Sequence, residues 1–195
     1  MDSKKLIGIT GGIGAGKSIV SRVLMALGYP VFNSDYASRL IVNSDPNVIR
    51  AIKKEFGETS YNQGVLNRKL IGELVFNHPE KLNQLNQIIH PAVGKALINW
   101  KDQQDKKILF NEAAILFETG NYKKYDATIL VTAPKQVRIL RVMKRDLASA
   151  EAVEKRMENQ WTDEQKIALA NYVVLNDDST LLLPQLLEVL KLIEG

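Results

Sequence analysis

The 195-residue sequence contains no cysteine. Disulfide bonds and zinc sites with thiolate ligands are therefore excluded, and the default expectation is a cytoplasmic protein. No stretch approaches the roughly 18 consecutive apolar residues that a membrane-spanning helix needs. The apolar run that follows Lys5 is too short for the hydrophobic region of a secretion signal. We therefore expect a soluble protein without a membrane partner.

Blocks of like charge are also missing. The chain has 26 Lys and Arg residues against 22 Asp and Glu residues, which gives a net charge of +4. Nucleic-acid-binding arms usually carry about five or more like charges in a row, so we expect no nucleic-acid partner. The length suits one compact domain with a small insertion. We expect a monomer or a weak homo-oligomer.

Strand-like and helix-like apolar patterns alternate along the chain. Short apolar runs predict strands over residues 6–10, 30–35, 107–113, 127–132 and 172–175. From about residue 36 to residue 104 the spacing predicts helices and no strand, with a kink or a restart near His90 because Pro91 interrupts the last helical segment. Strands that alternate with helices predict an α/β fold whose mostly parallel sheet is covered on both faces.

A glycine-rich segment, LIGITGGIGAGKS, joins the first predicted strand to the first predicted helix. From Gly11 to Ser18 it matches the phosphate-binding pattern G-x-x-x-x-G-K-[ST] in the context that the pattern requires. Backbone N–H groups in such a loop bind a polyphosphate, so we expect Lys17 to contact the phosphates of ATP and Ser18 to bind Mg²⁺. The rival dinucleotide pattern G-x-G-x-x-G fails because Lys17 occupies its third glycine position. A turn that binds nothing has no need of Lys17 and Ser18.

The same loop serves GTPases, ATPases and kinases, so other residues must indicate the reaction. No Asn-Lys-x-Asp or Asp-x-x-Gly segment occurs, which argues against a GTPase switch. A kinase needs a carboxylate to take the acceptor proton, and Asp35 follows the second predicted strand at the edge where the glycine loop lies. The alternative is that Asp35 only caps the next helix. Glu112, at the end of the third predicted strand, is a candidate Mg²⁺ ligand, with a solvated strand end as the alternative.

The helix predicted over residues 134–147 carries arginines at spacings of three and four residues. These are Arg138, Arg141 and Arg145, and we predict that they form one face opposite Val137, Leu140 and Met143. This basic face either binds phosphate or is a solvated stripe. The charged segment 144–166 predicts exposed helices that can close as a lid, with a capping box that begins at Thr162.

Together these residues resemble the dephospho-CoA kinase family, and the resemblance spans nearly the whole chain. The matching segments are Thr10–Ser18, Ser34-Asp35 with Arg39, His90-Pro91, Ile115–Glu118, Leu140–Asp146 and Asn176-Asp177. Many members have two aspartates spaced by one residue where this chain has Asn33 and Asp35. Asp35 is then the only carboxylate of that pair, which favours it as the base.

The resemblance implies a three-layer P-loop kinase core with a mostly parallel five-stranded sheet, a helical substrate-binding insertion and a small helical lid. The core would comprise residues 1–35, 105–143 and 167–195. Residues 36–104 would form the domain that receives the CoA-like substrate, and residues 144–166 would form the lid.

The resemblance also implies roles for the matching residues. Nucleotide binding would involve Gly12, Ile13, Gly14, Ala15, Gly16, Lys17, Ser18 and Arg145, with Asn176 and Asp177 beside the adenine. The catalytic residues would be Lys17, Asp35 and Arg141, with Arg141 and Arg145 stabilising the phosphoryl group. The acceptor would contact Asp35, Arg39, His90 and Glu118, although for His90 a structural role beside Pro91 is favoured over a catalytic one. Ser18 and Glu112 would hold Mg²⁺.

The implied reaction is the phosphorylation by ATP of the ribose 3′-hydroxyl of dephospho-CoA, the final step of coenzyme A biosynthesis. Two alternatives remain. The first is another small P-loop kinase that acts on a nucleoside or nucleotide, and the long helical insertion argues against it. The second is a nucleotide-dependent regulatory or binding protein, which would hydrolyse ATP slowly and without an acceptor.

Overall fold

The computed structural model describes residues 4–76 and 78–195, and its central feature is a five-stranded sheet. The strands are β1 (Lys5–Thr10), β2 (Val31–Asn33), β5 (Ile108–Glu112), β6 (Ala127–Thr132) and β7 (Tyr172–Leu175). Their order is β2-β5-β1-β6-β7, and every neighbouring pair is parallel. The predicted α/β class and parallel sheet are confirmed. The second strand ends at Asn33, so the predicted extension to residue 35 is wrong.

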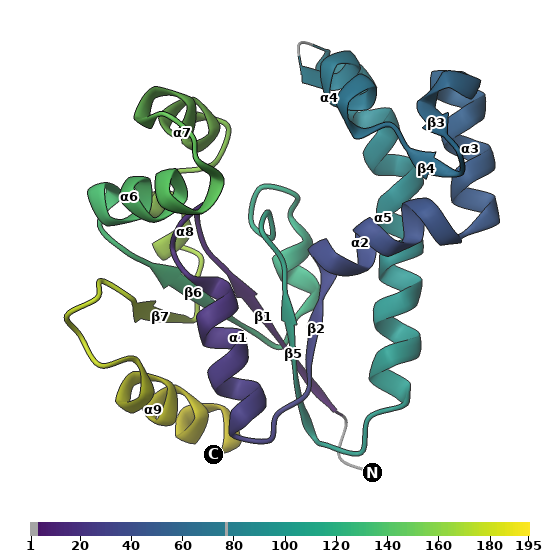
Figure 1. Cartoon of the computed structure of the whole chain (residues 1–195). Helices are drawn as coiled ribbons and strands as arrows, with labels where there is room; N and C mark the ends of the chain where they lie inside the picture. Colours follow the sequence, from purple (N-terminus) through teal and green to yellow (C-terminus); the bar gives the residue numbers. More distant parts are fainter. Residues whose placement is uncertain (1–3, 77) are drawn as a thin grey trace. The chain divides into compact units, whose positions relative to one another are not determined.

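One face of the sheet is covered by two helices, α1 (Lys17–Ala26) and α9 (Leu182–Glu194), which contact each other (Figure 1). Ile7 and Ile9 of β1 share a buried apolar cluster with Leu24 of α1 and Leu186 of α9. Because successive side chains of a strand point to opposite faces, Gly8 faces the other side of the sheet.

The opposite face near Gly8 is covered by the segment between β5 and β6, which contains the short helix η2 (Asn121–Lys124). A Cβ atom at Gly8 would overlap the side chain of Leu116 and crowd the ring of Tyr125. Leu116 and Phe117 are buried. A glycine at this position therefore lets the segment lie close against the strand.

Three further helices follow β6: α6 (Lys135–Asp146), α7 (Ala150–Glu158) and α8 (Asp163–Ile167). The predicted capping box at Thr162 is confirmed, because its side chain accepts from Gln165 N while the Gln165 side chain accepts from Thr162 N. The prediction that residues 144–166 are exposed throughout is wrong, because Val153 and Lys166 are both completely buried. Val153 packs against Ile139 and Val142 of α6. Met157, one turn further along α7, packs against the same cluster, and two apolar residues are too few to give a clear periodic signal.

The chain divides into two compact units, and the second is Ser34–Gln104. Its elements are α2 (Ser34–Ser44), α3 (Pro46–Phe56), η1 (Glu58–Ser60), β3 (Tyr61–Asn62), β4 (Val65–Leu66), α4 (Arg68–Phe76) and α5 (Pro79–Asp102). It has its own apolar core, which includes Val42, Ile52 and Ile71. The first unit runs through Asn33 and resumes over Asp105–Gly195.

The prediction that this inserted unit contains no strand is wrong. Residues 61–66 form a small antiparallel hairpin where no strand was predicted, and its loop residues Gln63 and Gly64 both have positive φ, at 48° and 80°. Such a two-residue turn suits a hairpin, but strands of two residues are too short to show alternation. Helix α5 runs across Pro91 without a restart, because it packs against α2, α3 and α4, and this packing outweighs one missing hydrogen bond. The predicted kink near His90 stays a prediction.

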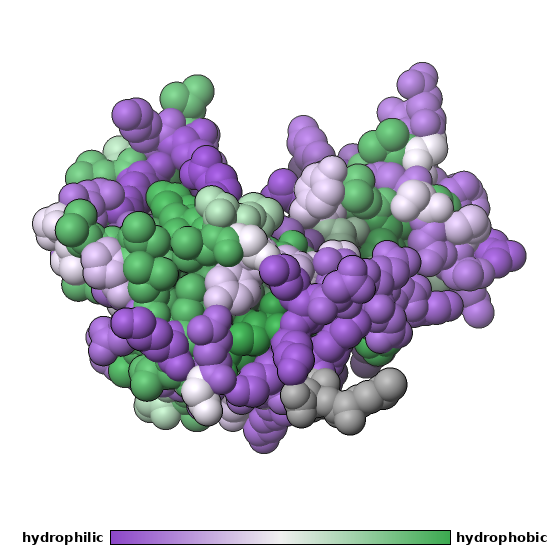
Figure 2. All heavy atoms as spheres, turned by 90° about the horizontal axis from the view of Figure 1, so that it is seen from below, coloured by the Kyte–Doolittle hydropathy of each residue, from purple (hydrophilic) through white to green (hydrophobic). Residues whose placement is uncertain are grey.

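Not every large apolar side chain is buried. Leu183 and Leu187 of α9 and Val173 of the edge strand β7 are each more than 40% exposed. Figure 2 shows hydrophobic residues mixed with hydrophilic ones on the face that it presents. No helix in residues 4–76 and 78–195 is both long and apolar enough to cross a bilayer.

Candidate active site

The glycine loop joins β1 to α1, and two of its residues require glycine. Gly14 and Gly16 have φ values of 80° and 93°, in the left-handed region that side chains disfavour. Within the described residues, no backbone acceptor pairs with the N–H of either glycine, whereas Ala15 N donates to Gly12 O at 3.1 Å. Gly16 also caps the N-terminus of α1. Unpaired N–H groups beside a helix N-terminus form a site for anionic phosphate oxygens.

The glycines also let other parts of the molecule approach the loop. A Cβ atom at Gly12 would overlap the Arg138 guanidinium, and one at Gly16 would overlap the Asn176 amide. Other side chains of the protein therefore pack against the loop, which is also accessible to a ligand. The absence of side chains at the glycines permits both the packing and the approach of a ligand.

The lysine and serine that complete the motif begin α1, as predicted. Lys17 Nζ donates a hydrogen bond to Gly11 O at 2.8 Å, so its charge lies against the loop itself. Ser18 is exposed. Lys17 can therefore reach an anion bound by the loop, and the Ser18 hydroxyl is accessible to a cation.

Glu112 ends β5 between the ends of two neighbouring strands. Its register partners are Ile9 of β1 and Asn33 of β2. Glu112 is buried, and Asn33 Nδ2 donates to Glu112 Oε2 at 3.1 Å. An aspartate at position 33 could not donate this bond, so Asn33 orients the carboxylate without adding a second negative charge. In the part of the chain that the structure describes, no cluster of three or more His, Cys, Asp or Glu side chains is arranged to hold a metal.

The three arginines of α6 do not form one exposed face. Arg138 is buried and Leu140 is 64% exposed, so the predicted basic face opposite Leu140 is wrong. Helix α6 buries Arg138 together with Ile139 and Val142. Arg138 is buried because its guanidinium finds charged and carbonyl acceptors inside the protein, which helical spacing alone does not reveal.

Arg141 contacts a backbone carbonyl group of the glycine loop. Its Nη1 donates to Gly14 O at 3.3 Å, and its Nη2 donates to Asn176 O at 2.8 Å and to the Asp178 carboxylate. Arg141 therefore connects the loop to the turn that follows β7. Arg141 thus lies beside the glycine loop, and its predicted contact with the phosphoryl group stays a prediction.

Asn176 and Asp177 both shape this turn. Asn176 is buried, and its Nδ2 donates to Ala15 O at 2.8 Å. Asp177 Oδ1 accepts from Thr180 N at 2.7 Å and from Ser179 N at 3.0 Å. These backbone hydrogen bonds, with that of Thr180 the stronger, lower the pKa of Asp177 to about 2.

Arg145 lies in an exposed ion-pair cluster at the end of α6. Its Nε and Nη2 donate to the two carboxylate oxygens of Asp146, which also accepts from Arg156 of α7. Hydrogen bonding to Arg145, reinforced by Arg156, lowers the pKa of Asp146 to about 2 and raises that of Arg145. The structure thus brings Arg145 together with α7 rather than with the loop.

Glu118 is held inside the first unit. Its Oε1 lies 2.9 Å from Nζ of the fully buried Lys166 and accepts from Trp161 N at 3.3 Å. Nζ of Lys166 is close enough for the ion pair, although its geometry does not make a hydrogen bond. Sequence reasoning missed Lys166, because a lysine in a charged segment is usually solvated.

The predicted acceptor residues of the inserted unit are exposed. Asp35 lies in the first turn of α2, and Arg39 follows one turn later on the same face. His90 is exposed on α5, immediately before Pro91. These side chains are accessible to a ligand.

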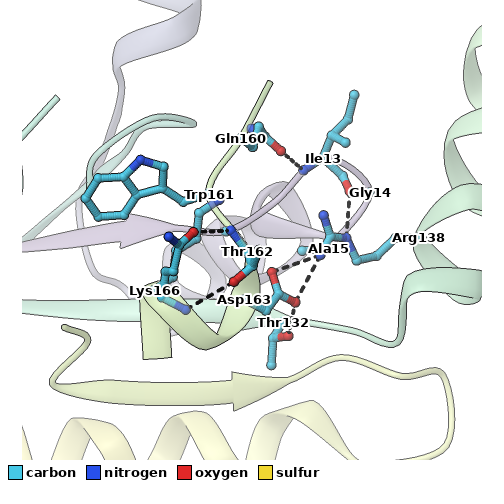
Figure 3. A network of polar contacts seen from close by, with 12 residues as sticks. Ile13, Gly14, Ala15, Thr132, Arg138, Gln160, Trp161, Thr162, Asp163 and Lys166 are labelled. Carbon is cyan, nitrogen blue, oxygen red and sulfur yellow. Dashed lines mark hydrogen bonds and ion pairs between the residues drawn. The ribbon is translucent and has the colours of Figure 1, made fainter. Parts of the chain in front are cut away.

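A group of side chains between the loop and α8 also escaped the sequence patterns. Gln160 Oε1 accepts from Ile13 N at 2.8 Å, and Arg138 pairs with Asp163 (Figure 3). The capping box gave the start of α8, but no local pattern indicates that residues beside it contact a loop more than a hundred residues away.

Comparison with known proteins decides the family. The dephospho-CoA kinase family model matches residues 5–181. The chain is 42% identical to dephospho-CoA kinase of Chlorobaculum tepidum, covering 88% of this chain and 86% of the relative, and 38% identical to that of Bacteroides fragilis, covering 94% and 90%. A Thermus thermophilus crystal structure superposes with a TM-score of 0.90 at 33% identity, covering 99% of both chains. The chain belongs to the dephospho-CoA kinase family.

Membership in the dephospho-CoA kinase family makes the chain a kinase of coenzyme A biosynthesis, which uses ATP as its phosphoryl donor. The resemblance, fold class and enzyme class predicted from the sequence are confirmed. The family match favours this interpretation over the two alternatives, which were a nucleoside or nucleotide kinase and a regulatory protein.

Proposed function

We propose that the chain transfers the γ-phosphoryl group of ATP to the ribose 3′-hydroxyl of dephospho-CoA, giving CoA and ADP. The observation that carries this proposal is the glycine loop of a dephospho-CoA kinase family member, in which the N–H groups of Gly14 and Gly16 have no backbone partner among the residues that the structure describes. We further propose a cytoplasmic enzyme that acts as a monomer or weak homo-oligomer, without a nucleic-acid or membrane partner.

The donor site would be built by residues 12–18. Their N–H groups would hold the phosphates, and Lys17 would move from Gly11 O to the β- and γ-phosphates. Asn176 and Asp177 would lie beside the adenine, because Asn176 is already bonded to the loop at Ala15. Arg141 would stabilise the transferred group from its place against Gly14, and Arg145 would reach it when the segment 144–166 closes as a lid.

Mg²⁺ would bind Ser18 and Glu112, whose oxygens suit this hard cation. The fit is supported by the Glu112 carboxylate, which the Asn33 amide orients through one oxygen only. Two protein oxygens are adequate because Mg²⁺ usually keeps several waters and binds substrate phosphates. When bound, the cation neutralises charge on the phosphates, while Glu112 holds it at the end of β5.

The acceptor would bind to the inserted helical unit, 36–104. Asp35 would take the proton of the 3′-hydroxyl, which its exposure permits. Arg39, one turn away, would pair with acceptor phosphate, and His90 would donate or accept a hydrogen bond. Glu118 would contribute to acceptor binding indirectly, because it holds the segment that contains Trp161 and Lys166 in place.

A coupled assay of ADP release tests the reaction. We expect rapid release with dephospho-CoA, slow release with nucleoside monophosphates, and almost none without an acceptor. A dephospho-CoA analogue that lacks the 3′-hydroxyl should bind without being phosphorylated. Rapid phosphorylation of a nucleotide, or of the 3′-deoxy analogue, would contradict the proposal, as would the same ADP release with and without acceptor.

A further inference from the structure

Both backbone polar groups of Ile13 in the glycine loop are held by side chains from distant segments. Gln160 Oε1 accepts from Ile13 N at 2.8 Å, and Arg138 Nε donates to Ile13 O at 3.0 Å (Figure 3). Hydrogen bonds to both the donor and the acceptor of one residue restrict rotation of its backbone. The loop therefore has a fixed point immediately before Gly14.

Arg138 is itself firmly anchored. It is 8% exposed, and its Nη1 donates to both carboxylate oxygens of Asp163, at 2.9 and 3.0 Å. Asp163 Oδ2 also accepts from Thr132 Oγ1 at 2.7 Å, at the end of β6. Charge-assisted bonds of this kind are among the stronger hydrogen bonds in proteins, so the sheet itself fixes the position of Arg138.

Gln160 is anchored by its neighbours. The next residue, Trp161, donates its backbone N–H to Glu118, and Thr162 begins α8 with a capping box. Lys166, one turn further, is buried against Glu118. The backbone on which Gln160 stands is therefore tied to the core through two separate contacts to Glu118.

These contacts divide the N–H groups of the loop into two classes. The N–H of Ile13 is bonded to Gln160, whereas those of Gly14 and Gly16 have no backbone partner in the described residues. We propose that Gln160 and Arg138 are positioning residues, which hold the backbone of Ile13 so that the N–H groups from Gly14 onward are preset for the donor phosphates. This inference rests on nucleotide binding by the loop, which is part of the proposed function.

An alternative role for Gln160 is that of a competitor, which occupies Ile13 N until a phosphate displaces it. The structure favours positioning, because the carbonyl of the same residue is held by Arg138 and the backbone beside Gln160 is anchored. A phosphate could displace Gln160 from Ile13 N only if the Gln160 side chain were free to move away. Here Gln160 and Ile13 are both held by further hydrogen bonds of the same network.

The test compares Gln160→Met with the control Asn159→Ala in the full-length protein. Methionine keeps the length of the side chain and removes the acceptor oxygen, while Asn159 is exposed and its amide donates to Lys155 O. The measurement is the Kd for ADP by calorimetry without acceptor. We expect Gln160→Met to raise this Kd about three- to tenfold, the equivalent of one neutral hydrogen bond, and Asn159→Ala to leave it unchanged.

Each other outcome overturns the inference. An unchanged Kd with a lowered melting temperature would make Gln160 merely structural, and a lowered Kd would make it a competitor. If the wild-type protein phosphorylates dephospho-CoA and binds ADP, such results contradict this inference alone. A wild-type protein that binds no ADP would contradict the proposed function and the inference together.

A second variant tests the other bond. Arg138→Lys keeps the charge but cannot contact Ile13 O and both oxygens of Asp163 in the same geometry. We expect a Kd for ADP that is raised at least as much as in Gln160→Met, with an unchanged KM for dephospho-CoA. An equal rise in the KM for dephospho-CoA would indicate a general disturbance rather than positioning of the donor loop.

Discussion

The nucleotide loop and the predicted acceptor residues are organised in opposite ways. Around the loop, Arg138 and Asn176 are buried and bond its carbonyl groups, so its backbone is held by the protein itself. In the inserted unit, Asp35 and Arg39 are exposed on α2. On the proposed function, the fold would preset the donor site, whereas the acceptor side chains would be organised by the substrate that they bind.

The strongest test of this comparison is to remove the predicted base. Asp35→Asn keeps the shape of the side chain but cannot take the acceptor proton, so we expect kcat to fall by a factor on the order of 10² to 10⁴. The Kd for ATP should stay nearly unchanged, because the loop does not depend on Asp35. Steady-state kinetics and calorimetry measure the two quantities.

Asp35→Glu serves as the matched variant, since it retains a carboxylate at a shifted position, and it should keep more activity than Asp35→Asn. Near-normal turnover in Asp35→Asn would remove Asp35 from the role of base. A large loss of ATP affinity in that variant would contradict the separation of donor and acceptor sites.

The second prediction concerns the buried ion pair between Lys166 and Glu118, which lies in the same unit as the glycine loop. Lys166→Met leaves the largely buried carboxylate of Glu118 without its partner, so we expect a loss of about 3–5 kcal/mol in the free energy of unfolding. For a chain of this length, the melting temperature should fall by roughly 6–20 °C. Thermal and urea denaturation measure the loss.

Lys144→Met is the control, because Lys144 is exposed and the same substitution there should have little effect on stability. The double variant Lys166→Met with Glu118→Met should recover much of the lost stability, since no charge is then left buried alone. A single Lys166→Met variant as stable as the wild type would show that the buried pair contributes nothing.

The same contrast explains how much the sequence could predict. The glycine loop, the five strands and the capping box at Thr162 follow from local patterns, and the structure has them at those places. The burial of Arg138 and Lys166 depends on Asp163 and Glu118, which lie 25 and 48 residues away. The periodicity of apolar residues along a helix or strand does not reveal partners so far apart in the sequence. Asp35, by contrast, could be proposed from its place in the sequence after β2, and its role as base stays a prediction.

The smallest expected effect comes from the exposed cluster at Asp146, which joins α6 to α7 outside the buried network. Arg145 and then Arg156 lower the pKa of Asp146 to about 2, so the folded protein holds the carboxylate ionised more strongly than the unfolded chain, whose aspartates titrate near 4. The stabilisation is therefore present above about pH 4 and is lost as the pH falls through about 2.

The variant Asp146→Asn tests this contribution. Its melting temperature should lie slightly below that of the wild type at pH 7, and the difference should shrink as the pH falls below 4. Because Asp177 titrates in both proteins, it cancels from this difference, and about 1 M salt should also reduce it. A difference that is constant from pH 7 to pH 3 would show that Asp146 acts through packing rather than charge.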